Sequence, residues 1–303
     1  MTSIDVHDLT KVHGTRRAVD GLTFRVPPGR VTGFLGPNGA GKSTTLRLLL
    51  GLDRPTSGSA GFDGRPYRAL TEPLRHVGAL LDARAAHGAR TGRDHLRVLA
   101  ASNRLPARRV DEVLAETGLT TAAGLRVRTY SLGMRQRLGI AAALLGDPGA
   151  VLLDEPANGL DPEGIVWVRG LLRRLAAEGR TVLVSSHLMT ETAAYADHLI
   201  VLGRGRLLAD TPLEEFVHAR VHPRVRVRTT DPAALSGALA RAGHRADEHP
   251  DGHWTVHHAR VDDVGRLASD AGVPLLELAA EEGTLEQAYF DLTAGETEFT
   301  AHR

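Results

Sequence analysis

The sequence predicts an α/β fold in which helical segments interrupt a sheet-forming core and a small second α/β domain follows. Residues 31–35 form a short apolar run that leads through a glycine-rich turn into a helical pattern at 43–52, the order of a buried strand, a loop and a helix. Residues 84–147 are mostly helical in pattern, and alternating strands and helices return at Ala150. This alternation is typical of a sheet covered by helices and interrupted by a helical insertion.

The core domain is expected to span residues 1–212, with a helical subdomain at about 84–147. Residues 3–9 and 22–26 alternate apolar and polar side chains, which is the period of half-buried strands. In the remainder of the domain the predicted elements are helices at 94–103, 107–117, 134–145, 162–177 and 188–196, strands at 151–153 and 181–185, and a hairpin at 200–208.

Residues 213–303 are expected to form an accessory α/β domain. Its predicted elements follow a β-α-β-α-β order, with room for one more hairpin strand, and resemble a small ferredoxin-like module. Its histidines lack the ordered spacing of metal ligands, so solvated or packing roles are favoured for them. The elements are strands at 224–228, 254–256 and 274–278 and helices at 231–242, 260–271 and 284–292.

A phosphate-binding loop stands between the apolar run and the helix of the core domain. Its glycines let consecutive backbone N–H groups turn inward around an anion, Lys42 can reach the outer phosphates, and the Ser43 hydroxyl can ligate Mg²⁺. The alternative is a glycine-rich turn before a helix that binds no phosphate. Lys11 is the only other lysine in the chain, so a chance match to the motif is improbable and this alternative has a probability of roughly 2%. A nucleoside triphosphate is therefore predicted to bind at the residues that match G-x-x-x-x-G-K-[ST]: Gly36, Pro37, Asn38, Gly39, Ala40, Gly41, Lys42, Ser43 and Thr44.

The composition narrows the class of protein. The 303 residues carry a formal net charge of +1, which leaves no basic excess to neutralise a nucleic-acid backbone, so nucleic acid is not an expected partner. The chain has no cysteine, which excludes disulfides, thiolate metal sites and thiol catalysis. No stretch approaches the roughly 18 consecutive apolar residues that a membrane span requires, so we expect the chain not to cross a bilayer by itself.

Two adjacent carboxylates follow a predicted buried strand. Asp154 stands at the carboxyl end of that strand, where it can hold Mg²⁺ directly or through water beside the phosphate loop. Glu155 comes next and is the natural group to orient or deprotonate an attacking water. Acids are common at strand ends, but after a phosphate-binding loop the catalytic interpretation is favoured by about nine to one.

Five motifs in a fixed order resemble those of ABC ATPases, over about residues 3–210. In the second motif, which has the form seen among drug-exporter subunits, Ser131 can cap a helix and Gly133 allows close approach of an anion. The motifs are the phosphate loop, the signature motif at 130–137 (YSLGMRQR), the Asp154-Glu155 strand, the D-loop at 158–161 (NGLD) and the switch histidine in Ser186-His187.

The resemblance implies a P-loop NTPase fold, with a RecA-like core, an antiparallel β subdomain and the helical insertion. It also implies that two copies meet head to tail, so that ATP held by Lys42 and Ser43 of one copy is covered by the signature motif of the other. Glu155 would be the catalytic base, His187 would contact the γ-phosphate, and Asp161 would link the two sites. The signature residues acting across the interface would be Ser131, Leu132, Gly133, Met134 and Arg135.

Two positions depart from the family's pattern. The family usually has an aromatic residue before Gly14 that stacks on adenine, whereas this chain has His13 there, and Val19 is an alternative contact for the base. The second departure is Asp82, the last residue of a predicted loop at 77–82. Most relatives have Gln at this position. Asp82 could ligate Mg²⁺, although it adds negative charge near the γ-phosphate, and a plain loop acid stays open as its alternative.

The resemblance implies the ATP-binding and ATP-hydrolysing subunit of an ABC exporter for drug, antibiotic or lipid-like compounds. Its cofactors would be ATP and Mg²⁺, and its partners a second copy of itself and a separate transmembrane permease. It would lie at the cytoplasmic face of the membrane, peripheral via the permease. Residues 84–96 would line the groove that binds that partner, with a flexible surface linker as the alternative. Two rivals stay open, a soluble ABC ATPase without a membrane partner and a nucleotide-sensing regulatory module with little hydrolysis.

Overall fold

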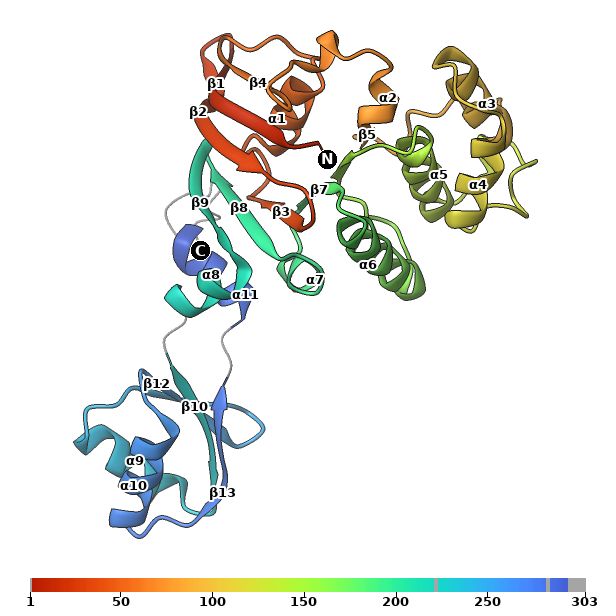
Figure 1. The fold of residues 1–303 in the computed structure, drawn as a ribbon. Coiled ribbons are helices and arrows are strands. Elements are labelled where there is room, and N and C mark those ends of the chain that lie inside the picture. Colours follow the sequence, from red (N-terminus) through yellow and green to blue (C-terminus); the bar gives the residue numbers. More distant parts are fainter. Residues whose placement is uncertain (1, 221–222, 282–283, 294–303) are drawn as a thin grey trace. The chain divides into compact units, whose positions relative to one another are not determined.

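The computed structural model describes residues 2–220, 223–281 and 284–293, and its contacts divide the chain into two units. The first unit contains Met1–Leu213 and the second is Glu214–Leu292 (Figure 1). Each unit has its own hydrophobic core. None of the helices in the described ranges is long and apolar enough to span a membrane.

A six-stranded sheet forms the centre of the first unit (Figure 1). Its strand order is β5-β6-β7-β3-β8-β9, and every neighbouring pair is parallel except β8 with β9. The central strand β7 is buried along its whole length, as its continuous apolar run predicts. Parallel pairing places the carboxyl ends of β3, β6 and β7 at one edge of the sheet. The strands are β3 (Val31–Leu35), β5 (Val77–Leu80), β6 (Ala150–Asp154), β7 (Thr181–Ser186), β8 (His198–Gly203) and β9 (Arg206–Pro212).

An antiparallel sheet in the order β2-β1-β4 belongs to the same unit. Its alternating apolar residues face the core, where Val6 of β1 stands opposite Phe24 of β2. The Phe24 ring lies against Phe34 of β3, with 5.7 Å between the ring centroids, so aromatic packing joins the two sheets. The elements are β1 (Ile4–His13), β2 (Arg16–Val26), β4 (Ser57–Phe62) and α1 (Lys42–Leu49).

The helical subdomain follows β5 and precedes β6 in the chain, and it contains α3, α4 and α5 (Figure 1). The prediction of a loop throughout 77–82 is wrong, because its first four residues form strand β5 and pair in parallel with β6. A four-residue apolar run is too short to be assigned to a strand without knowledge of its partner. The helices of the unit are α2 (Pro73–His76), α3 (Gly92–Ser102), α4 (Arg108–Glu116), α5 (Leu132–Leu144), α6 (Pro162–Ala177) and α7 (Met189–Ala193), with 3-10 turns at Tyr67–Ala69 and Val127–Thr129.

The second unit is built on an antiparallel sheet in the order β11-β12-β10-β13. With α9 after β10 and α10 after β12, this is the ferredoxin-like arrangement, and β11 is the extra hairpin strand. Its hydrophobic core includes Val225, Val227, Trp254 and Val256. The elements are α8 (Leu213–Arg220), β10 (Arg224–Thr229), α9 (Pro232–Arg241), β11 (Ala246–Glu248), β12 (His253–His257), α10 (Val261–Asp270), β13 (Leu275–Glu281) and α11 (Leu285–Thr293).

Helix α5 packs closely on β5, and a side chain at Gly78 should therefore destabilise the fold. A Cβ added at Gly78 would lie 1.9 Å from the Ala143 carbonyl oxygen, which cannot move without shifting α5, so Gly78→Ala should lower the free energy of unfolding by about 2 kcal/mol or more. Gly170→Ala on α6 is the matched control, because its added Cβ would meet nothing within 4 Å and alanine should stabilise the helix by about 0.5–1 kcal/mol. Urea denaturation of both variants measures the difference, and a Gly78→Ala protein as stable as its parent would contradict the close packing.

Candidate nucleotide-binding and catalytic site

The predicted phosphate loop joins the end of β3 to the start of α1, at the edge where the carboxyl ends of the strands meet. Gly39 and Gly41 have φ angles of 85° and 102°, in the left-handed region that favours glycine. A Cβ on Gly41 would also lie 2.5 Å from the Ala18 carbonyl oxygen. Glycine is therefore required at position 41 on both counts. The backbone N–H groups at the start of α1 have no partner within the helix and can bind an anion.

Lys42 is buried at the base of the loop, with 7% of its surface exposed. Its Nζ donates hydrogen bonds to the carbonyl oxygens of Gly36, at 2.5 Å, and Pro37, at 3.3 Å. Burial lowers the pKa of the Lys42 ammonium, while the carboxylates of Glu155 and Asp154 act in the opposite direction and raise it. The loop thus holds a compact cation where the outer phosphates of a nucleotide would lie.

Both carboxylate oxygens of Asp154 are held by hydroxyl groups. The Ser43 Oγ donates to Asp154 Oδ2 at 2.8 Å, and the Ser185 Oγ donates to Asp154 Oδ1. Ser43 and Asp154 together present hard oxygen ligands of the kind that Mg²⁺ prefers, so the donor set fits this ion. Sequence reasoning missed Ser185, which lies on β7 and fixes the orientation of the carboxylate.

Glu155 has a φ of 51°, a conformation that non-glycine residues adopt rarely and at a cost in free energy. Its N–H donates to the Ser185 carbonyl oxygen at 3.2 Å and to the Ser185 hydroxyl at 3.1 Å, and its carbonyl oxygen accepts from Gln136 Nε2 at 3.0 Å. Its carboxylate lies 2.8 Å from Nδ1 of His187. Strained backbone held by several bonds is typical of functional sites, and here it places the predicted base beside the predicted switch histidine.

A cavity of about 500 Å³ connects these groups. It brings together all the predicted phosphate-loop residues except Gly36, both carboxylates and His13, and it adds Arg16 and Ala18, which sequence reasoning missed. His187 lies outside this lining and reaches it through its contact with Glu155. The structure contradicts the alternative base contact at Val19, because that side chain is fully buried in the hydrophobic core. The lining residues are His13, Arg16, Ala18, Pro37, Asn38, Gly39, Ala40, Gly41, Lys42, Ser43, Thr44, Asp154 and Glu155.

The signature motif forms the start of α5 and lies outside the lining of this cavity. The Ser131 hydroxyl caps the helix by accepting the N–H of Met134 at 3.2 Å. Leu132 is 46% exposed, and Arg135 Nε donates to the Tyr130 carbonyl oxygen at 3.3 Å. The motif is thus a capped helix end with exposed residues, and none of its residues lines the nucleotide cavity of its own chain.

The D-loop packs against the signature motif of the same chain. A Cβ on Gly133 would lie 3.1 Å from the Gly159 carbonyl oxygen. The Asp161 carboxylate caps α6 by accepting the Gly164 N–H at 2.8 Å. Neither Asp161 nor Gly159 lines the nucleotide cavity, so the role of Asp161 between two sites stays a prediction.

Asp82 follows β5 at the same edge of the sheet but does not line the cavity. Its carboxylate is exposed and accepts the backbone N–H of Arg84 at 2.8 Å. This short-range bond is what a plain loop acid makes. The contact of Asp82 with Mg²⁺ stays a prediction.

Comparisons with known proteins decide the family. The family model for ABC transporters matches residues 19–158, and a domain of unknown function (DUF8746) matches residues 223–286. The bacitracin transport ATP-binding protein BcrA of Bacillus licheniformis is 35% identical over 302 residues, which cover 98% of this chain and 99% of that protein. The chain belongs to the ABC transporter family.

Further matches agree with this ABC transporter assignment. The daunorubicin resistance ATP-binding protein DrrA3 of Streptomyces coeruleorubidus is 33% identical, with 96% of each chain covered. A solved ATP-binding subunit of an ABC transporter is 27% identical with a TM-score of 0.65, over 71% of this chain and 92% of that one. The dimeric ABC transporter cassette MJ0796 is 25% identical with a TM-score of 0.64, over 69% of this chain and 98% of that one.

These findings confirm the predicted fold and family. The chain is an ATP-binding, ATP-hydrolysing subunit of the ABC transporter family. They give no support to a soluble ABC ATPase or to a nucleotide sensor with little hydrolysis. The order of five short motifs was therefore sufficient to identify the family from the sequence.

The hydroxyl of Ser185 generates a prediction about turnover. Ser185→Ala removes the hydrogen bonds from the serine hydroxyl to Asp154 and from the Glu155 N–H to that hydroxyl. It should therefore reduce ATP turnover at least tenfold and lower the free energy of unfolding by about 1–2 kcal/mol. Ser186→Ala is the matched control, since the Ser186 hydroxyl accepts the Leu188 N–H at 3.0 Å instead, and it should keep turnover within about threefold. Turnover assays with urea denaturation test both variants, and full turnover in Ser185→Ala would contradict the positioning role.

Proposed function

We propose that two copies of this chain, bound to a transmembrane permease at the cytoplasmic face of the membrane, sandwich ATP and Mg²⁺ and drive export of an antibiotic-like, drug-like or lipid-like compound. The observation that carries the proposal is that the nucleotide cavity holds the phosphate loop and the carboxylates but none of the signature residues. A second copy would supply them. The relatives named for bacitracin transport and daunorubicin resistance support an antibiotic-like compound, and the dimeric cassette supports the pairing.

In this proposal the two ends of the cavity hold the two ends of ATP. The phosphates would bind the N–H groups of the loop and the Lys42 ammonium. The base would then lie toward His13 and Arg16, which stand opposite each other on β1 and β2 and line the cavity. An imidazole and a guanidinium are both planar, so either can stack on a purine.

The Ser43 hydroxyl and the Asp154 carboxylate would hold Mg²⁺. When bound, the ion supplies positive charge that neutralises the phosphate oxygens and polarises the terminal phosphoryl group. Ser185 supports this role because its hydroxyl keeps the Asp154 carboxylate in one orientation. The fixed carboxylate would need little rearrangement to become a ligand.

Glu155 would take a proton from the water that attacks the γ-phosphorus. Its carboxylate is held at 2.8 Å from His187 Nδ1, so the histidine can orient the base and stand near the terminal phosphate. The Ser131 hydroxyl and the positive end of α5 from the second copy would stabilise charge on the opposite side of the transferred group. Each copy would thereby contribute to both sites.

A variant that binds ATP but cannot remove the proton tests this proposal. Glu155→Gln should lower turnover at least a hundredfold, and an ATP-bound dimer should accumulate because hydrolysis no longer separates the copies. Sedimentation at low protein concentration should shift from 32.4 kDa to twice that mass with ATP and Mg²⁺, but not with ADP.

The matched control is Glu155→Gln combined with Lys42→Ala, which should stay monomeric because the phosphates lose their cation. A Glu155→Gln chain that stays monomeric at saturating ATP would contradict the composite site. Dimerisation of the double variant would show that pairing does not depend on bound ATP.

A further inference from the structure

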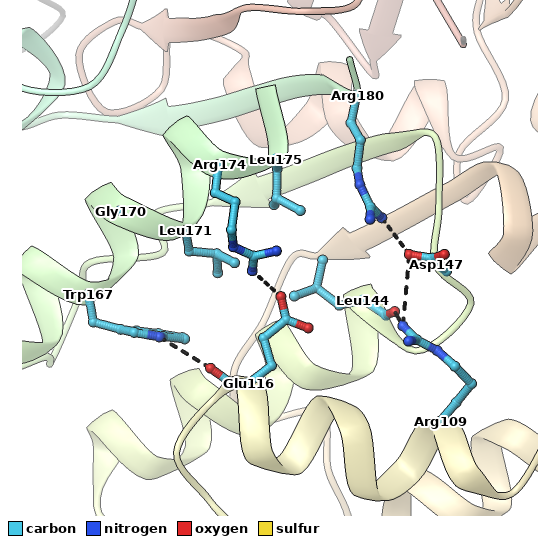
Figure 2. Close-up of a pocket in the computed structure, with 10 residues that line it drawn as sticks. All are labelled: Arg109, Glu116, Leu144, Asp147, Trp167, Gly170, Leu171, Arg174, Leu175 and Arg180. Atoms are coloured by element: carbon cyan, nitrogen blue, oxygen red, sulfur yellow. Dashed lines mark hydrogen bonds and ion pairs between the residues drawn. The ribbon is translucent and has the colours of Figure 1, made fainter. Parts of the chain in front are cut away.

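A second cavity of the first unit, between α4, α5 and α6, is lined by arginines that are paired within the chain. Figure 2 shows Arg174 paired with Glu116 and Arg180 paired with Asp147. The charges at this cavity are therefore balanced inside the chain. The second unit differs, because two of its arginines lack such partners.

Strand β10 of the second unit carries three arginines in a row, Arg224, Arg226 and Arg228. Successive side chains of a strand point to opposite faces of the sheet. Val225 and Val227, which alternate with the arginines, belong to the core that residues of α9 and α10 complete. These two helices lie together on one side of β10 and β13 (Figure 1). The arginines therefore lie on the face of the sheet opposite the two helices.

The neighbouring strand β13 places acids beside the two outer arginines. Both strands are antiparallel and in register on this face. We call the six paired residues the arginine face: Arg224 with Glu281, Arg226 with Ala279, and Arg228 with Glu277.

The charges of the arginine face are only partly satisfied within the chain. Arg226 Nε lies 3.4 Å from Glu277 Oε1, and Glu281 Oε2 accepts a threonine hydroxyl at 3.4 Å. Arg224 and Arg228 form no hydrogen bond or ion pair with any residue that the structure describes. A guanidinium has five N–H donors and a carboxylate has two acceptor oxygens. The face therefore has unused donors in one row and unused acceptors in the next.

This arrangement suits a second copy of the same face better than an anionic ligand. An anion at the arginines would be repelled by acids only about one strand spacing, or 5 Å, away. A two-fold axis that runs parallel to the strands, between β10 and β13, would exchange the two rows. Because the rows are in register, each outer arginine of one copy would then lie over an acid of the other.

We propose that the second units of two copies pair through the arginine face. Arg224 lies over Glu281 of the second copy, and Arg228 lies over Glu277 of the second copy. Arg226 lies over Ala279, whose small side chain leaves room for a guanidinium. The pairing goes beyond the proposed function, because it needs no nucleotide and uses no residue that lines the nucleotide cavity.

The pairing is expected to be weak, because two rows of side chains cover less area than a standard protein interface. It gains most where two copies are already held near each other, since this raises their effective concentration. At low protein concentration without nucleotide the chain therefore stays monomeric.

Sedimentation equilibrium of the full-length chain without nucleotide tests the pairing. In low salt, at on the order of 100 µM protein, the mass should rise from 32.4 kDa toward twice that value as concentration increases. About 0.5 M salt should raise the Kd of self-association at least about fivefold, because exposed charges are then screened.

Two single variants and their mixture locate the contact. Arg228→Glu and Glu277→Arg should each raise the Kd at least about tenfold, because like charges then face each other across the axis. An equimolar mixture should recover a Kd within about threefold of the wild-type value, because opposite charges then face each other in the mixed dimer. Repulsion inside one chain is the same before and after mixing, so only contact between copies explains recovery.

Arg266→Glu on α10 is the matched control. It makes the same charge change at an arginine that is 75% exposed on a helix, and it should leave the Kd unchanged. Circular dichroism establishes that each variant is folded, and Arg224→Glu mixed with Glu281→Arg repeats the test where a variant of the first pair is not.

A wild-type chain that stays monomeric at these concentrations would overturn the proposal. So would a mixture that associates no better than its two variants alone, or single variants that associate as the wild type does. The measurement contains no ATP, so its failure is distinct from failure of the ATP-dependent dimer.

Discussion

The parallel pairing of β6 with β7 is the constraint on which the catalytic site depends. In this register Asp154 stands opposite Ser185, so the serine hydroxyl meets the Asp154 carboxylate and the Glu155 N–H at once. A shift of one residue would turn alternate side chains to the other face of the sheet and separate these groups. The buried apolar residues of both strands prevent such a shift, and core packing thereby determines where the catalytic carboxylates lie.

Helix α5 connects this constraint to the rest of the first unit. Ser131 caps its start, and Gln136 in its middle donates to the carbonyl oxygen of the strained Glu155. Gly78 allows the helix to approach β5 closely. One helix therefore carries both the cap of the signature motif and a hydrogen bond to the carbonyl of Glu155.

The sequence predicted those parts of the site whose residues are contiguous. The phosphate loop and the Asp154-Glu155 pair are read from local order, because glycine, lysine and acids at fixed spacing have specific chemistry. Ser185 and Gln136 were missed because they act on Glu155 across 30 and 19 residues of chain, which no local pattern reveals. Val19 was wrongly offered as a base contact, since only the packed structure shows that this side chain joins the core.

The central claim, that each ATP site needs residues from two chains, is tested most directly by mixing two inactive variants. Lys42→Ala removes the phosphate cation, and Ser131→Arg blocks the signature helix end, so each variant alone should hydrolyse almost no ATP. In an equimolar mixture, half of randomly formed dimers are mixed and contain one intact site, so turnover should recover to about a quarter of the wild-type value. Turnover in the mixture no higher than that of either variant alone would contradict the composite site.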